Sequence, residues 1–334
     1  MAVAASFPRV AVIGAGAVGG YFGVRLALAG AEVHFLVRGG AAQIRREGFR
    51  VHSDLHGELA VEKPQVWEEA AAIPACDFVL VAVKTTANGQ LPALLPPSLL
   101  APDAVVVMLQ NGLDVEAAAA AAAPGHAVLG GVTYISAWKE APGRIRHSEK
   151  GLVKLAEWTA DGRPAGVTPA VAAARGLFQA AGIPAEALPD LLLPRWQKLL
   201  WNIPYNGLSV VLGADTAALS ADPAARRLVA TLMAEVRAAA AAWGREIPAA
   251  FAAAMAAGTA AMPPYRPSML QDWDAGRPLE IEAIYRTPLR RAAEKGVAMP
   301  VTAALAEQLS FLAGRCSGLR SPPRVCPAAG RMGR

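Results

Sequence analysis

The chain has 334 residues, enough for two domains that each bury a core of their own. Its formal net charge is +5, but residues 313–334 hold five arginines and no acidic residue, so this final segment alone supplies the excess. The rest of the chain is close to neutral and lacks a basic stripe, which argues against a nucleic-acid partner.

Cysteine usage and hydropathy indicate the compartment. Cys76, Cys316 and Cys326 show no metal-ligand spacing and are too few for a framework of several disulfides, which predicts no metal and a reducing cytoplasm. Only Arg9 precedes the first apolar run, so this run does not read as an export signal. The longest uncharged stretches, such as residues 247–265, are interrupted by Pro or Gly, which predicts no transmembrane helix and no membrane partner.

The first predicted strand, residues 9–13, leads into a Gly-x-Gly-x-x-Gly motif and a helix over residues 18–29. Gly14 permits the tight turn, Gly16 lets the backbone approach a pyrophosphate, and Gly19 lets the helix pack on the strand. A lone motif of this kind can be an ordinary turn, but the flanking strand and helix favour a dinucleotide site on the helix N-terminus. The predicted cofactor contacts here are Gly14, Ala15, Gly16, Ala17, Val18 and Gly19.

The end of the second predicted strand, residues 31–37, distinguishes the two nicotinamide cofactors. An NAD site usually carries Asp or Glu there for the ribose 2′-hydroxyl. This chain has Arg38 instead, and Glu32 lies at the wrong end of the strand. Arg38 can pair with a 2′-phosphate, which predicts NADPH; the alternative is a solvated loop arginine.

Two further buried strands are predicted over residues 77–83 and 104–109, after a pair of short hairpin strands at 49–52 and 58–61. Lys84 and Asn111 follow the buried strands. Ligands of doubly wound sheets bind outside the carboxyl ends of the strands, so both residues are candidate contacts of cofactor or substrate. As an alternative, Asn-Gly after a strand is also an ordinary turn.

The remaining pattern predicts an α/β, Rossmann-type doubly wound sheet followed by an all-α C-terminal domain. The expected elements of the first domain are a helix at 116–123, strands at 128–137, 144–147, 152–157 and 183–188, a turn at 142–143, and a helix at 169–181. The expected helices of the second are 191–208, 223–243, 248–257, 268–293 and 301–313. We expect a dinucleotide-binding domain at 1–189, a hinge at Pro189 and Asp190, a helical substrate domain at 190–313, and a disordered tail at 314–334.

A polar stripe marks the first helix of the second domain. Lys198, Asn202 and Asn206 recur every four residues and share one helix face among apolar neighbours. A lysine in such surroundings can donate a proton near neutral pH. The structural alternatives are a snorkelling Lys198, an Asn202 that relieves carbonyls disturbed by Pro204, and a C-cap at Asn206.

Two later motifs complete a pattern: Ser268-Met269-x-x-Asp272, and Gly276-Arg277-x-x-Glu280-Ile281. With the glycine motif and the Lys-x-x-x-Asn-x-x-x-Asn helix, in this order, the chain resembles the ketopantoate reductase (2-dehydropantoate 2-reductase) family over residues 9–312. The resemblance implies reduction of ketopantoate to pantoate for pantothenate biosynthesis, with hydride from NADPH. One departure is Arg286, where relatives have a small glycine-containing turn.

The resemblance also implies roles for individual residues. Lys198 matches the proton donor, and Glu280 matches a glutamate near lysine and cofactor that either orients Lys198 or accepts the substrate hydroxyl; a surface role for Glu280 is the alternative. The implied substrate contacts are Asn111, Lys198, Asn202, Asn206 and Ser268, and the implied further cofactor contacts are Arg38, Lys84, Asn111, Ala137 and Glu280. The expected partner is a small-molecule 2-keto acid, and a homodimer is left open. Competing hypotheses are a reductase of another 2-keto acid or carbonyl compound, and an NADPH-binding sensor without turnover.

Overall fold

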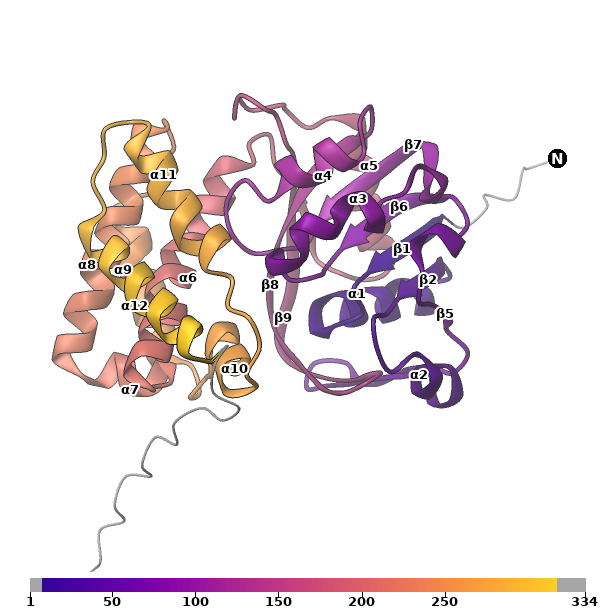
Figure 1. Ribbon diagram of the computed structural model, residues 1–334, viewed down its shortest axis with the longest axis horizontal. Helices are drawn as coiled ribbons and strands as arrows, with labels where there is room; N and C mark the ends of the chain where they lie inside the picture. Colours follow the sequence, from indigo (N-terminus) through magenta and orange to yellow (C-terminus); the bar gives the residue numbers. More distant parts are fainter. Residues whose placement is uncertain (1–7, 317–334) are drawn as a thin grey trace, which may run out of the picture. The chain divides into compact units, whose positions relative to one another are not determined.

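The computed structural model describes residues 8–316, which form two compact units that meet in sequence between Arg195 and Trp196 (Figure 1). The residues of the expected tail beyond 316 lie outside the described residues, whereas residues 314–316 belong to the last helix.

The first unit is built on a single sheet that follows the order β4-β3-β9-β8-β7-β6-β1-β2-β5, with β10 paired to β9. Its strands are β1 (Arg9–Ile13), β2 (Glu32–Leu36), β3 (Phe49–Ser53), β4 (Gly57–Val61), β5 (Gln65–Trp67), β6 (Cys76–Val81), β7 (Leu100–Met108), β8 (Ala127–Ala141), β9 (Arg144–Glu157) and β10 (Ala185–Ala187). Its helices before the boundary are α1 (Ala17–Leu28), α2 (Ala41–Glu47), α3 (Leu91–Leu94), α4 (Glu116–Ala122) and α5 (Pro169–Ala180), with short 3₁₀ turns η1 (Ala70–Ala72), η2 (Thr85–Gln90) and η3 (Pro97–Leu99).

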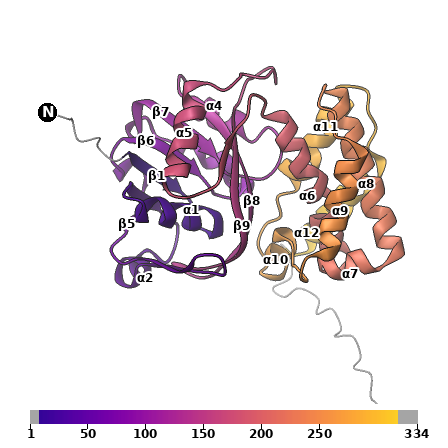
Figure 2. The ribbon, with the colours of Figure 1, turned by 180° about the vertical axis from the view of Figure 1, so that it is seen from behind.

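The central strands confirm the doubly wound prediction. Strand β1 pairs in parallel with β2 on one side and β6 on the other, and β6, β7 and β8 continue the parallel order. These strands are almost wholly apolar and buried, as a sheet covered on both faces requires. Helices α1 and α5 pack on one face, with the rings of Phe22 and Phe178 5.6 Å apart, and α3 and α4 lie on the other (Figures 1 and 2). The chain reverses its winding between β1 and β6, where such sheets bind their ligands.

The prediction was wrong in extent for the second half of the sheet. Strands β8 and β9 form one long antiparallel hairpin rather than three short segments, closed by the predicted turn at Pro142 and Gly143. Gly151, between two of the predicted segments, lies within β9 at a register shift, with φ +113°. Helix α2 and strand β5 were missed, because both are short and their stability comes from packing on the sheet.

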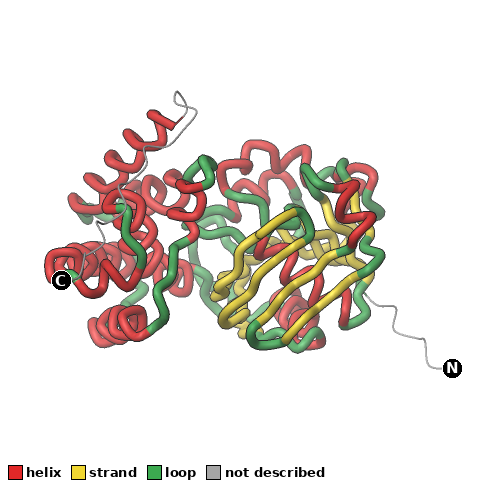
Figure 3. The backbone as a smooth tube through the Cα atoms, turned by 90° about the horizontal axis from the view of Figure 1, so that it is seen from below, coloured by secondary structure: helices red, strands yellow, loops and turns green. Residues whose placement is uncertain are grey.

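In the second unit the regular elements among the described residues are all helices, as predicted, whereas the strands belong to the first unit (Figure 3). Its helices are α6 (Leu192–Leu212), which begins in the first unit, α7 (Thr216–Ala221), α8 (Pro223–Ala242), α9 (Ala249–Ala261), α10 (Ser268–Asp274), the π-helical turn η4 (Glu282–Arg286), α11 (Thr287–Ala293) and α12 (Pro300–Cys316). Helix α7 was not predicted.

The single helix expected over residues 268–293 was wrong. Helix α10 ends before Gly276, which has φ +62°, and Pro278 follows in an extended segment that leads to η4 and α11. Gly and Pro at this spacing end a helix, but the surrounding helical periodicity concealed them. Among the described residues, no helix has the length and apolarity to cross a membrane, and no cluster of His, Cys, Asp and Glu has the makings of a metal site.

Candidate active site

The glycine motif forms the turn between β1 and α1, and two of its glycines are required by the chain itself. Gly14 has φ +98°, and a Cβ atom there would lie 2.8 Å from the backbone nitrogen of Val83. A Cβ atom at Gly19 would overlap the carbonyl oxygen of Gly14. These glycines let the turn form and let α1 approach β1 and the segment after β6.

Gly16 is different, because nothing in the described chain requires a glycine there. Its φ of −78° and ψ of −156° suit any residue, and a Cβ atom would meet no atom within 4 Å. Gly16 is the N-cap of α1, and in the described structure no side chain caps this helix and no acidic residue stands in its first turn. The N-terminus of α1 therefore faces open space, as a pyrophosphate site needs. Ala15, Ala17 and Val18 complete the turn and the start of the helix.

The segment after β2 carries a cation at the end nearest the glycine turn. Arg38 is exposed directly after this strand, whose last residue, Leu36, accepts a hydrogen bond from the backbone N–H of Gly14. Glu32 lies at the opposite end of β2, where its carboxylate pairs with Arg9 and His34. The position beside the glycine turn thus carries a cation where an NAD site usually carries a carboxylate.

Lys84 and Asn111 follow β6 and β7, and the side chain of one residue joins the two segments. Gln110 is buried, and its amide Nε2 donates to the carbonyl oxygen of Val83 at 2.9 Å and to Oδ1 of Asn88 at 2.7 Å. Lys84 itself is exposed at the N-cap of η2. The structure therefore brings the Lys84 segment and the Asn111 segment together at the carboxyl ends of adjacent strands.

A buried ion pair that sequence reasoning missed lies behind Asn111. Arg195 is 2% exposed and pairs with Glu116, which is 1% exposed, with Nε to Oε1 at 3.0 Å. The same guanidinium donates to the carbonyl oxygens of Gln110 at 2.5 Å and Met108 at 3.4 Å. The pair thus fixes the backbone just before Asn111. Its sequence signal was weak: an arginine and a glutamate 79 residues apart in apolar surroundings.

Ala137, the remaining predicted cofactor contact of the first unit, lies in β8 beyond the part of that strand that pairs with β7. It faces His147 of β9, next to a register shift between Ser136 and Ala137. A shift of this kind frees backbone groups from the ladder, so a backbone contact from Ala137 to a ligand stays a prediction.

In the second unit, Lys198, Asn202 and Asn206 follow one another at single-turn spacing along α6. Asn202 and Asn206 are buried, and Lys198 is partly buried. The amide nitrogen of Asn202 is buried and finds no hydrogen-bond partner within the described part of the chain. Buried polar atoms in native proteins are nearly always bonded, so this amide is a candidate for contact with a ligand.

The structure excludes a C-cap at Asn206, because α6 continues to Leu212. The helix also runs through Pro204, whose missing N–H normally breaks a helix. The hydroxyl of the fully buried Tyr285 donates to the carbonyl oxygen of Ile203 at 3.0 Å, and a Cβ atom at Gly207 would lie 2.6 Å from the same hydroxyl. Residues of η4 therefore pack closely on α6 around Pro204.

The first of the two later motifs packs against this part of α6, and the second follows it in the chain. The side-chain oxygen of Asn206 accepts from the backbone N–H of Met269 at 3.4 Å, which brings Ser268 beside Asn206. Arg277 donates to Asp272 at 2.9 Å, closing the bend after α10, and Glu280 follows this bend, 4% exposed. The Asp272–Arg277 pair therefore joins the two motifs.

Arg286, the departure noted in the sequence, has its partners on α12. Its guanidinium lies 3.3 Å from the carboxylate of Glu307 and donates to the hydroxyl of Ser310 at 2.9 Å, both on α12. Arg286 therefore links η4 to α12.

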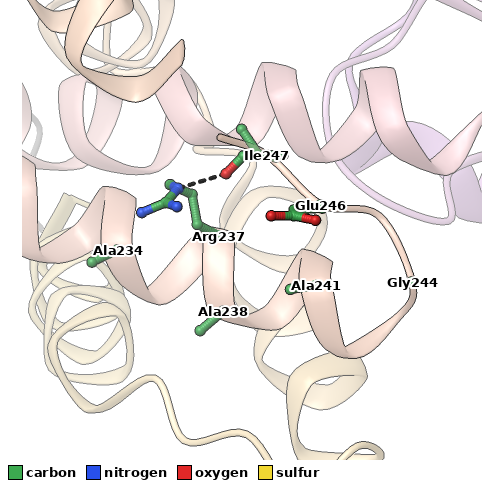
Figure 4. A pocket seen from close by; sticks show the side chains of 7 residues that line it. All are labelled: Ala234, Arg237, Ala238, Ala241, Gly244, Glu246 and Ile247. Atoms are coloured by element: carbon green, nitrogen blue, oxygen red, sulfur yellow. Dashed lines mark hydrogen bonds between the residues drawn. The ribbon is translucent and has the colours of Figure 1, made fainter. Parts of the chain in front are cut away.

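An open depression of the second unit lies elsewhere, at the end of α8 and the following loop (Figure 4). Three of its seven lining residues are alanines, and Arg237 donates across it to the carbonyl oxygen of Ile247 at 2.7 Å. None of the predicted site residues lines this depression, and its arginine serves to tie α8 to the loop before α9.

Comparison with known proteins identifies the chain. The sequence profile of the ketopantoate reductase PanE/ApbA family matches residues 10–160, and that of the C-terminal part of this family matches residues 190–313. A 2-dehydropantoate 2-reductase of Nostoc sp. is 44% identical over 92% of this chain and 96% of its own length.

Solved structures agree with the sequence matches. A 2-dehydropantoate 2-reductase from Geobacter metallireducens superposes with a TM-score of 0.85 at 36% identity, covering 91% of this chain and 99% of that protein. A D-mandelate dehydrogenase solved with NADH and anilino(oxo)acetate has a TM-score of 0.82 at 24% identity, with coverage of 92% and 99%; this likeness concerns the fold.

The fold and the glycine turn thus define an oxidoreductase of the NAD(P)-dependent class. Within that class, the chain belongs to the ketopantoate reductase PanE/ApbA family, which confirms the resemblance found in its motifs.

Proposed function

We propose that this chain catalyses the NADPH-dependent reduction of 2-dehydropantoate to pantoate, a step of pantothenate biosynthesis. The observation that carries the proposal is the 44% identity to the Nostoc 2-dehydropantoate 2-reductase over almost the whole of both chains. The motif residues in both units support it.

The proposed cofactor contacts are those at the carboxyl ends of β1, β2, β6 and β7. Gly16 supports this assignment, since its lack of a Cβ atom has no use within the chain and leaves α1 open to a phosphate. Arg38 supports NADPH over NADH, because a guanidinium beside the glycine turn can pair with a 2′-phosphate. Lys84, Asn111 and the backbone of Ala137 complete the proposed set.

The proposed chemistry divides between hydride and proton. Bound NADPH supplies a hydride to the carbonyl carbon of the keto acid. Negative charge then builds on the carbonyl oxygen, and Lys198 stabilises it as a cation and donates the proton. A cation that also donates a proton lowers the barrier more than it stabilises the bound ketone.

The remaining polar groups of α6, together with Ser268, are proposed to hold the substrate. Asn202, Asn206 and Ser268 present amide and hydroxyl groups, which can bind a carboxylate or hydroxyl without adding charge beside Lys198. The unpartnered amide of Asn202 supports this role. Glu280, buried beyond the Asp272–Arg277 bend, is proposed to orient Lys198 or to accept the substrate hydroxyl.

The test is the initial rate of NADPH oxidation with ketopantoate and with shorter and longer 2-keto acids. Wild type is compared with Lys198→Ala and with Lys63→Ala, a control at an exposed lysine before β5. We expect a preference for ketopantoate and a fall in kcat of about 10²- to 10⁴-fold in Lys198→Ala alone, the range for loss of a general acid. Activity on another keto acid alone would show that ketopantoate is not the substrate. NADPH binding without turnover would favour the hypothesis of a sensor.

Cofactor preference has its own test. Arg38→Ala removes one charge-assisted contact and should raise KM for NADPH about tenfold or more, with little change for NADH. Arg163→Ala, at an exposed loop arginine, is the matched control. Equal losses with both cofactors would show that Arg38 does not contact the 2′-phosphate.

The oligomeric state has a test of its own. Sedimentation of the purified protein would show whether it is a homodimer.

A further inference from the structure

Gln110 stands out among the polar residues of the first unit that the proposed chemistry does not use. It is 5% exposed and sits between the last residues of β7 and Asn111. Both hydrogens of its amide nitrogen have acceptors, Val83 O and Asn88 Oδ1. A backbone carbonyl can only accept, so the bond to Val83 fixes which way the amide is turned.

In this orientation the amide oxygen of Gln110 lies on the side away from Val83 and Asn88. This oxygen, Oε1, is buried and has no hydrogen-bond partner in the described part of the chain. Because the amide oxygen has no such bond, the hydrogen bonds donated by the amide nitrogen hold this side chain in place. The two bonds to the segment after β6 therefore decide where Gln110 lies.

Both ends of this bridge are rigid. At one end, the carbonyl oxygen of Gln110 accepts from Arg195, which is itself paired with Glu116 in the interior. At the other end, Val83 packs so closely on the glycine turn that a Cβ atom at Gly14 would lie 2.8 Å from its backbone nitrogen. One side chain thus joins the ends of β6 and β7 and, through Val83, the turn after β1.

We propose that Gln110 is a positioning residue for the dinucleotide: it holds the Lys84 segment and the Asn111 segment at the spacing that the cofactor requires. The inference rests on the proposed function, which assigns cofactor contacts to Lys84 and Asn111. The ladder bond from the N–H of Leu109 to the carbonyl oxygen of Val81, 2.9 Å long, is followed on both strands by loop segments. The Gln110 amide sets the spacing of these two segments beyond the ladder. Pre-organised contacts spare the ligand the cost of ordering them.

The experiment measures Kd for NADPH by fluorescence in wild type, Gln110→Leu, Asn88→Leu and the double variant. Gln110→Leu keeps a side chain of similar size but removes both hydrogen bonds, and should weaken NADPH binding about tenfold. Asn88→Leu removes one of the two bonds and should weaken NADPH binding about threefold. The double variant should bind no more weakly than Gln110→Leu, because the Asn88 bond is already lost there.

A control separates positioning from general stability. Gln179→Leu removes an amide-to-carbonyl bond of the same kind, to Ala185 O at 3.0 Å, from α5 in the same unit. It should leave Kd for NADPH unchanged even if its Tm falls. Binding by Gln110→Leu within twofold of wild type, or an equal loss in Gln179→Leu, would overturn the inference. A wild-type protein that binds no NADPH would instead overturn the proposed function.

Discussion

Alanine at two glycines of the same turn should separate folding from cofactor binding. Gly16→Ala places a Cβ atom where no atom of the described chain lies within 4 Å, on a backbone that alanine adopts freely. Gly19→Ala places one against the carbonyl oxygen of Gly14 and 2.9 Å from the Cβ atom of Ala82. The first Cβ atom points to the space proposed for a pyrophosphate, and the second points into the protein.

The expected magnitudes follow from these surroundings. In Gly16→Ala, the weaker N-cap and the less flexible unfolded chain offset each other, so the free energy of unfolding should change by less than about 1 kcal/mol. A displaced pyrophosphate loses at least one hydrogen bond to a charged group, about 1.5–3 kcal/mol, which weakens NADPH binding about ten- to hundredfold. Gly19→Ala should lower the free energy of unfolding by about 1–3 kcal/mol or more, because backbone must move.

Two measurements on each variant suffice: the urea midpoint without ligand, and Kd for NADPH from fluorescence. The reasoning predicts a stable Gly16→Ala that binds poorly and a Gly19→Ala that is destabilised before any ligand is added. If Gly16→Ala bound NADPH as wild type does, the space before α1 would not be the pyrophosphate site. If it were as unstable as Gly19→Ala, Gly16 would have a structural role that the geometry does not contain.

The buried ion pair and a buried histidine give two further predictions. Arg195→Leu leaves Glu116 buried without its cation and should cost about 3–5 kcal/mol in urea unfolding, whereas adding Glu116→Leu should recover part of the loss; an equally unstable double variant would contradict this. Burial lowers the pKa of His147, whose ring accepts from Ser53 and donates to the carbonyl of Glu149. Since the unfolded chain binds the proton more readily, this stability is present above about pH 6.5 and is lost as pH falls through the folded-state pKa. His147→Gln should therefore lose less Tm than wild type between neutral and mildly acidic pH, and parallel losses would refute the assignment.

The sequence by itself determined the features whose causes are local. The glycine turn, the buried strands β1, β6 and β7, and the Lys198 stripe are each recognisable because a few adjacent residues satisfy one geometric need. The family motifs were readable for the same reason. Gly16 shows the limit of this reading: only the structure reveals that its neighbours do not require a glycine, whereas those of Gly14 and Gly19 do.

Tertiary structure decided what depends on residues distant in the chain. The length of the β8–β9 hairpin comes from cross-strand pairing, and next to Pro204 the carbonyl oxygen of Ile203 accepts from Tyr285, 82 residues away. The bond from Gln110 to Val83 spans 27 positions and the Arg195–Glu116 pair spans 79, so neither leaves a periodic signal. Local patterns therefore predicted which residues bind and react. Long-range packing decides which side chains are held in place, because the partners that fix them lie far away in the sequence.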